Sequence, residues 1–398
     1  MSLPTRRPAL DRPTLERRLA AIRERMADAE IDCLVVVGRG NIAEFGAQHY
    51  LSGYTPVLRN AATIVALSGE PILAVTTPSD IALSAGRTPL RDVRVAAFGS
   101  APNSLAALIA AMAGEGTVGV VGLEDVVPAA EFARWVAAAP AATFVDGADV
   151  LMPIKMVKSA DDIVAMQHAG RTADEAFEVF TASLRDGKTL AAAAGDAEAA
   201  LRASGAHEIL VYASPGPHFL HRPDGVPPRD GDLLTVFVEF SDPDGYWVEL
   251  ARLVTVGTLG PDQIAVAAAA VEAIEVAGAA LRPGRAASEA FADIAAVLRR
   301  HGVTSGLWAG HGVGIDHDLP VIGGDDPTPL AAGMVVALHP HIVTADGGVG
   351  ACLCDTFVIG EEGTTPLSRL PRTPVALAVP PAAPTAGAAQ IPSPVRQP

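Results

Sequence analysis

The sequence predicts two domains: an α/β domain over residues 10–150, followed by an α+β domain over residues 151–370. Two observations support this prediction. Before residue 150, short apolar runs alternate with segments of helical periodicity, as in a sheet covered by helices. After it, a long amphipathic pattern begins, and pairs of helical segments alternate with strand-like runs. The 398-residue chain has room for two domains of ordinary size.

The first domain opens with a helix over residues 13–30, because Leu15, Leu19, Ile22 and Met26 recur at helical spacing. A short buried strand follows at residues 33–38. The remaining elements are predicted from the same two patterns. They are two strands around a Ser-Gly-Glu-Pro turn at 63–75, a strand and helix at VRVAAFG and NSLAALIAAMAG, and a second such pair at TVGVVG and PAAEFARWVAAA.

The second domain opens with a long amphipathic helix, for which Ser159 and the two aspartates after it form an N-cap. Further helices are predicted near residues 189–204, 261–280 and 287–301. Strands are predicted at EILVYAS, GDLLTVFVEF and GYWVELARLVTVG, with strand and loop from residue 307 to 360. The tail at 372–398 is rich in proline and alanine and has no period, so we expect it to be disordered.

The composition excludes several classes of protein. Hydrophobic residues make up 49% of the chain and charged residues 19%, which is a globular balance. The net charge of −16 argues against nucleic acid or an anionic membrane as a partner. Three cysteines do not form a disulfide framework in a chain of this size. With no apolar leader and no segment approaching a membrane span, we expect a cytoplasmic protein.

The histidines indicate where a functional site lies. Eight of the ten fall between His207 and His341, several of them beside glycine or proline. Such a cluster in one domain is more typical of a site than of scattered surface residues. The segments that carry it are GPHFLHRPDG, DPDGYWVELAR, GHGVGIDHDLP, VVALHPHIV and GACLCDTFVIGEEG.

These segments, in this order, resemble the pita-bread family of methionine aminopeptidase, aminopeptidase P, prolidase and creatinase. The resemblance runs from about residue 10 to residue 371. YLSGY, IKMVKSADDIVAMQHAG and LRPGRAASEAFADIAAVLRRHG are similar to further family segments, and GHGVG at 310–314 is the sharpest match. The resemblance implies a pita-bread fold for the second domain. It also implies a homodimer in which the first domain of one subunit caps the site of the other.

The resemblance breaks at the metal ligands. Metal-dependent members carry two aspartates, one histidine and two glutamates. His311 matches the histidine, and Glu249 takes the place of the second aspartate. Val238 stands at the place of the first aspartate, with Glu239 one step away.

The two glutamate positions are also changed, to His339 and Cys354. The four family carboxylates balance the charge of two divalent ions. In this chain Glu249 and a Cys354 thiolate would give −2, which is enough for one ion. The sequence therefore predicts an atypical member without an ordinary dinuclear peptidase site.

The preferred hypothesis is a creatinase-like hydrolase that uses no metal and cleaves a C–N bond in a small polar metabolite. Creatinase keeps a catalytic histidine in a loop before a Gly-Asp pair, and His221 lies ten residues before Gly231 and Asp232. His221 would be the general base, because imidazole titrates near neutral pH. Glu249 would anchor the substrate. His317 matches the family's second histidine, which contacts substrate, and the polar walls would be formed by His311, His339 and His341.

Two alternatives stay open. In the first, Glu249, His311, His339 and Cys354 form a rebuilt mononuclear site for zinc or, less favourably, iron or copper. Such an enzyme could be a hydrolase, a lyase or a biosynthetic tailoring enzyme. In the second, the chain is a catalytically dead pita-bread module that binds a small molecule without turnover. An acidic protein would also attract a cationic substrate, but the sequence alone locates no acidic patch.

Overall fold

The computed structural model describes residues 10–40, 44–217, 220–305 and 308–379. Its first part is a six-stranded sheet in the order β4-β3-β2-β1-β5-β6. β1 lies at the centre, antiparallel to β2 and parallel to β5. The strands are β1 (Cys33–Arg39), β2 (Asn60–Ala66), β3 (Ile72–Val75), β4 (Asp92–Val95), β5 (Thr117–Val121) and β6 (Thr143–Asp146). The predicted α/β architecture is therefore observed.

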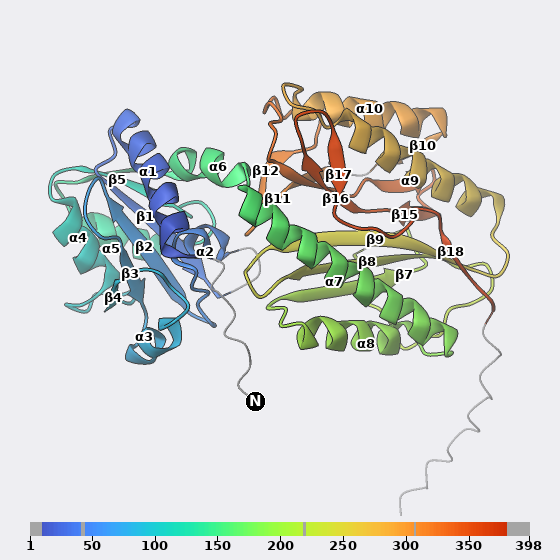
Figure 1. Ribbon diagram of the computed structural model, residues 1–398, viewed down its shortest axis with the longest axis horizontal. Helices are drawn as coiled ribbons and strands as arrows, with labels where there is room; N and C mark the ends of the chain where they lie inside the picture. The colour runs from blue at the N-terminus through green and yellow to red at the C-terminus, as the bar shows by residue number, and fades with distance from the viewer. Residues whose placement is uncertain (1–9, 41–43, 218–219, 306–307, 380–398) are drawn as a thin grey trace, which may run out of the picture.

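Helices pack around this sheet, on the left of Figure 1. α1 begins at Arg12 because the Asp11 side chain accepts a hydrogen bond from the backbone of Thr14 and so caps the helix. Its apolar stripe is buried. The helices are α1 (Arg12–Asp28), α2 (Gly46–Ser52), α3 (Pro78–Ser84), α4 (Leu105–Ala113) and α5 (Ala129–Ala138).

Two helices connect the first sheet to the second part of the chain. α6 (Ala148–Met156) is followed by Val157, whose backbone is extended. α7 (Ala160–Arg185) begins directly after Ser159, the predicted N-cap. Ser159 and Asp162 form a capping box, in which each side chain bonds to the backbone of the other. The exact boundary expected at residues 150 and 151 stays a prediction.

The second part is an α+β layer structure with helix pairs on opposite sides of curved sheets (Figure 1). One sheet has the order β18-β9-β8-β7, and two others have the orders β12-β11-β13-β16-β17 and β10-β14-β15. The helices are α8 (Leu190–Ala203), α9 (Pro261–Ala280) and α10 (Ala287–Arg300). The strands are β7 (Ile209–Ser214), β8 (Leu233–Ser241), β9 (Trp247–Val256), β10 (Val303–Ser305), β11 (Gly310–Val313), β12 (His317–Val321), β13 (Val335–Leu338), β14 (His341–Thr344), β15 (Gly350–Cys352), β16 (Asp355–Ile359), β17 (Thr364–Pro366) and β18 (Val375–Leu377).

The expectation of disorder from residue 372 is wrong for residues 372–379. Val375–Leu377 form β18, which pairs in parallel with the edge of β9. Arg372 Nε lies 2.6 Å from Asp355 Oδ2, which fixes the chain just before that strand. A composition rich in proline and alanine does not reveal that a partner strand is available elsewhere in the chain. The pairing of β18 with β9 therefore could not be predicted from the sequence pattern. Residues 380–398 lie outside the described residues.

One further expectation needs correction. α9 is long and apolar enough to cross a membrane by length and composition alone, although no such segment was expected. Half of that segment is buried inside the protein. Val266, Ala270 and Ile274 are fully buried in the core that α9 shares with α10. Its apolar character is accounted for by packing within this domain.

The two parts of the chain are in direct contact. Phe45 and Trp247 stack with ring centroids 6.5 Å apart, and His49 Nε2 lies 3.0 Å from the carbonyl oxygen of Asp244. Gly46 is required at this contact, because a Cβ there would collide with the carbonyl oxygen of Ile315. This close approach places the first sheet beside the segment that carries His317.

Candidate functional site

Two buried glutamates form the base of the site. Glu239 on β8 lies directly opposite Glu249 on β9 in the antiparallel register, with 7% and 3% of each residue exposed. The turn between the strands sets this register. Asp242 Oδ1 accepts hydrogen bonds from the backbone of Asp244 and Tyr246, and Gly245 adopts a φ of +89°. Opposed residues share one face of a sheet, so both carboxyl groups point to the same side.

Three histidines from the neighbouring sheet close over these glutamates. His311 Nε2 lies 3.3 Å from Glu249 Oε1, and His339 Nε2 lies 3.7 Å from Glu249 Oε2. His317 Nε2 lies 2.8 Å from Glu239 Oε1 and 3.7 Å from Glu249 Oε1. The His311 ring centroid is 5.0 Å from that of His317 and 5.1 Å from that of His339. The five side chains form one cluster, hereafter the Glu/His cluster.

A change in strand register orients the histidine rings of the Glu/His cluster. β11 and β12 pair with a shift between His311 and Gly312, which is a bulge in the ladder. Bulges redirect side chains and are common beside functional sites. On the other side, His311 pairs with Ala337 of β13, and His339 follows the end of that strand. The bulge and the strand end therefore bring residues from three chain segments onto Glu249.

The protonation state of His311 follows from its neighbours. Its Nδ1 lies 2.9 Å from the carbonyl oxygen of Gly312, which can only accept a hydrogen bond, so the neutral ring carries its proton on Nδ1. The lone pair of Nε2 then faces Glu249 Oε1, a buried oxygen with no hydrogen-bond partner among the described residues. Two acceptors at 3.3 Å require a positive charge between them, either a proton or a metal ion.

Electrostatics favours the proton on Glu249 when no metal is bound. Burial, followed by the charge of Glu239, raises the pKa of Glu249 to about 8. Burial opposes a charge on His317, but its hydrogen bond to Glu239 and the nearby carboxylates raise its pKa to about 9. Burial and the neighbouring His311 lower the pKa of His339 to about 3. At neutral pH the metal-free cluster therefore contains a His317–Glu239 ion pair beside a protonated Glu249.

The structure brings together most of the residues selected from the sequence. Glu249, His311, His317 and His339 all lie in the Glu/His cluster. Glu239, which lies one residue after the position expected for the first family aspartate, belongs to the cluster as well.

His221 and His341 lie elsewhere. His221 is exposed and lines a separate cavity of about 300 Å³ with Ser214, Pro217 and Asp224, a cavity that no member of the cluster lines. His341 pairs with Cys352 on the neighbouring strand, and its ring bonds to the carbonyl of Pro217. The expected base and one expected wall residue are thus not brought to Glu249.

Cys354 is not among the ligand atoms that cluster. The group whose atoms all lie within 4.8 Å of one another is Glu249, His311 and His317. Cys354 is fully buried against Phe237 and Ala251. Burial, followed by the charge of Glu249, raises the pKa of its thiol well above the usual value, so the thiolate is disfavoured. The group contains His317, which the predicted ligand set lacked, and it contains neither His339 nor Cys354, which that set included.

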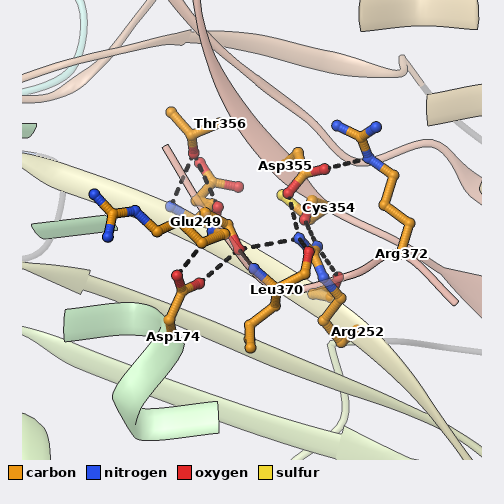
Figure 2. A network of polar contacts seen from close by, with 11 residues as sticks. Asp174, Glu249, Arg252, Cys354, Asp355, Thr356, Leu370 and Arg372 are labelled. Atoms are coloured by element: carbon orange, nitrogen blue, oxygen red, sulfur yellow. Dashed lines mark hydrogen bonds and ion pairs between the residues drawn. The ribbon is translucent and has the colours of Figure 1, made fainter. Parts of the chain in front are cut away.

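Asp355, beside Cys354, anchors this wall of the site (Figure 2). Arg252 Nη2 lies 2.7 Å from Asp355 Oδ1, and Arg372 Nε contacts the other oxygen. Arg252 Nη1 also donates to the carbonyl of Cys354. Two arginine side chains therefore hold Asp355 in place. Thr356 Oγ1 then exchanges hydrogen bonds with the Glu249 backbone, which fixes β16 against β9.

Comparison with known proteins agrees with this architecture. The model of the creatinase/prolidase N-terminal domain matches residues 18–157, and that of metallopeptidase family M24 matches residues 164–361. A probable dipeptidase PepE of Mycobacterium tuberculosis is 28% identical over 230 residues, which are 56% of this chain and 61% of that relative. A Xaa-Pro dipeptidase of Pyrococcus furiosus is 26% identical over 234 residues, which are 56% of this chain and 66% of that protein.

Solved structures show the same likeness over nearly the whole chain. The dipeptidase PepE from Mycobacterium ulcerans has a TM-score of 0.80 at 26% identity and covers 93% of this chain and 100% of its own. The prolidase from Pyrococcus horikoshii has a TM-score of 0.77 at 20% identity and covers 89% and 99%, which shows the fold alone. The chain belongs to the pita-bread family of creatinase, aminopeptidase P and prolidase.

The family model is that of a metallopeptidase, and the donor atoms of the cluster have features that suit a divalent ion. The orphaned oxygen of Glu249 and the Nε2 lone pair of His311 face each other, and His317 completes a group of three donors. A ligating histidine normally donates its other N–H to a carbonyl or carboxylate, as His311 does to Gly312. The residues present fit one divalent ion.

Proposed function

We propose that this chain is a hydrolase that cleaves an amide-type C–N bond in a small substrate, with the Glu/His cluster as its reaction centre. The observation that carries the proposal is Glu249, a carboxyl group whose side chain is 2% exposed, whose Oε1 has no hydrogen-bond partner, and whose pKa is raised to about 8. Perturbed carboxyl groups of this kind concentrate at catalytic sites. Membership in a family that contains dipeptidases supports hydrolysis as the reaction class.

Glu249 is the proposed general base in place of His221. A base is most effective when its pKa lies near the working pH, and a carboxyl with a pKa of about 8 meets that condition. Because its pKa is about 8, Glu249 is ionised in only a minor fraction of molecules at neutral pH, and it is this form that takes a proton from water as the oxygen attacks the substrate carbon. The same carboxyl then gives that proton to the leaving nitrogen as the C–N bond breaks. His221 lies in a separate cavity, which is the reason for the change of assignment.

His317 is the proposed electrostatic partner. With a pKa raised to about 9, its imidazolium is present at neutral pH and is held by Glu239. A cationic donor beside the attacked carbon stabilises the negative charge that develops on the substrate oxygen. His311 and His339 are neutral polar walls in this scheme, as expected from the sequence.

A second candidate is a mononuclear metal enzyme, favoured by the mutual proximity of the ligand atoms of Glu249, His311 and His317. These residues would hold one divalent ion, which would supply Lewis-acid catalysis when bound. We infer that two ions are not accommodated, because His339 and Cys354 replace family carboxylates and the Cys354 thiol is disfavoured as a thiolate. This chain would then be an atypical member of its family.

The assembly and location follow as further proposals. We propose a homodimer, by analogy with the family; exposed apolar residues such as Leu58, Trp308 and Leu319 are available to an interface. We also propose a reducing compartment such as the cytoplasm, because all three cysteines are free and buried.

A substrate screen tests the proposed function. Purified protein would be incubated with Xaa-Pro and other dipeptides and with small amides and ureas, and free amine release would be measured. The proposal predicts turnover of at least one C–N substrate that is abolished in Glu249→Gln. Tight binding of these compounds without any amine release would instead favour a pita-bread binding module. Release of an unsaturated product without water uptake would favour a lyase.

A further inference from the structure

A cavity lies between the two parts of the chain and reaches the Glu/His cluster. Its volume is about 440 Å³, which suits a ligand of dipeptide size. The first sheet and the loops after its strands supply one wall, including Asp125 and Asp146. The second part of the chain supplies the opposite wall, including Asp316 and His317. One chain therefore builds a pocket from both of its parts.

His317 connects this cavity to the reaction centre. Its ring lines the cavity, and its Nε2 lies 2.8 Å from Glu239 and 3.7 Å from Glu249. The Glu249 side chain behind it is 2% exposed and presents Oε1 without a hydrogen-bond partner. Glu249 itself does not line the cavity, so His317 is the cluster residue that a ligand there would meet first. A ligand in the cavity would thus extend from the first sheet to the cluster.

The walls of the cavity carry an excess of negative charge. Glu124, Asp125 and Asp146 are exposed at the side of the first sheet. Lys155 also lines the cavity, but its Nζ is 2.5 Å from Asp318 and 3.7 Å from Asp316, so those carboxylates neutralise it. The excess on the first-sheet side is therefore not balanced by that lysine.

We propose that this cavity is the substrate pocket and that it selects substrates bearing a cationic group, such as an ammonium or guanidinium. The cationic end would lie against Asp125 and Asp146, and the scissile C–N bond would lie at His317. The identification of the bound molecule as a substrate rests on the proposed function. The charge selectivity of the cavity stands separately, because it follows from the lining residues alone. Carboxylates that converge on a cavity lower the free energy of a bound cation and raise its rate of entry.

A binding experiment tests the selectivity without requiring turnover. The probes are Nα-acetyl-L-argininamide, a monocation, and its neutral isostere Nα-acetyl-L-citrullinamide, titrated calorimetrically against the full chain at low ionic strength. We expect the arginine probe to bind about tenfold more tightly, which corresponds to a few partly solvated ion pairs. The preference should shrink at high salt.

Variants locate the effect. Asp125→Asn and Asp146→Asn retain the shape of each side chain, and the asparagine oxygen can still accept from Ala148 as Asp146 does. The double variant should lose most of the preference, whereas Glu361→Gln, an exposed carboxylate on the turn after β16, should keep it. Equal affinities for the two probes in the wild type would overturn the proposal. So would a preference that survives in the double variant.

Turnover separates this inference from the proposed function. Selective binding of Nα-acetyl-L-argininamide without hydrolysis of any cationic amide would refute the hydrolase and leave the cavity selectivity supported. Hydrolysis of neutral and cationic amides with equal kcat/KM would support the hydrolase and overturn the selectivity.

Discussion

Glu239 and Glu249 lie directly opposite each other on adjacent strands, both buried, and His317 approaches both carboxyl groups. Two buried carboxyl groups on directly opposed residues of adjacent strands do not both ionise readily. One therefore forms an ion pair with His317, and the other keeps its proton to a pKa of about 8. This division of roles between two chemically identical side chains underlies the proposed mechanism.

Glu239→Gln should move the alkaline limb of the pH–activity profile. Glu239 raises the pKa of His317, so the imidazolium persists to a pH of about 9 in the wild type. Without that carboxylate His317 loses its proton at lower pH, and activity should decline from correspondingly lower pH. The matched control is Glu272→Gln, which removes the carboxylate that lies 2.6 Å from His301 outside the site. An unchanged limb in Glu239→Gln would exclude the assigned role of His317.

Metal content should not exceed one divalent ion per chain. The donor group is Glu249, His311 and His317, and the neighbouring carboxylate of Glu239 is held by His317 at 2.8 Å. Mass spectrometry of protein grown with zinc, iron and copper would give the count. Bound metal should disappear in His311→Ala and His317→Ala but persist in Cys354→Ser. Two ions per chain, or loss of metal in Cys354→Ser, would contradict this description of the site.

Acid should weaken the contact between the two parts of the chain through His49. Burial lowers the pKa of His49 to about 4, while in the unfolded chain it titrates near 6.5. Below pH 6.5 the unfolded chain takes up a proton that the folded chain refuses. The free energy of unfolding contributed by neutral His49 is therefore present above pH 6.5 and is lost as the pH falls towards 4, by up to about 3 kcal/mol.

Denaturant unfolding of wild type and His49→Gln between pH 4 and 7.5 measures this effect. The stability difference between the two proteins should be largest near neutral pH and should narrow as the pH falls. The Thr55 and Asp244 contacts of His49 give the variant hydrogen-bond partners, so it should fold. A difference that stays constant across the range would show that His49 does not titrate as described.

Loss of the Asp355 carboxylate should be strongly destabilising. Asp355→Ala leaves Arg252 buried without its counter-charge, which costs about 3–5 kcal/mol. Asp92→Ala is the control, because the Asp92–Arg94 pair is partly exposed and is worth less than about 1 kcal/mol. Chemical denaturation of both variants would compare them. Equal losses of stability would mean that the Arg252 contact does not anchor this wall.

The sequence predicted the architecture better than it predicted the site. Ser159, the apolar stripe of α1 and the ordered family motifs each specify local structure, and those features appear as expected. Family positions also located Glu249 and His311. Four of the five cluster residues were predicted from family positions. This succeeded because the motifs identify the fold, and the fold determines where those positions lie in space.

The errors came from relationships that a linear pattern does not contain. Glu239 was passed over because alignment spacing pointed to Val238. The Asp-Pro-Asp-Gly turn is centred near residue 244, and that centre makes Glu239 the true partner of Glu249. His221 was chosen by its distance from Gly231 along the chain, but the loop that carries it lies against another cavity. Strand register and loop direction are tertiary properties, and both were decisive here.

The most direct test of the account compares Glu249→Gln with His221→Ala on the substrate that the screen identifies. We expect kcat/KM to fall by at least about 10³ in Glu249→Gln, the usual scale for losing a catalytic acid–base. His221→Ala should stay within about threefold of the wild type, because it lies outside the cluster. Circular dichroism would confirm that both variants fold. An inactive His221→Ala beside an active Glu249→Gln would contradict the assignment of the Glu/His cluster as the reaction centre.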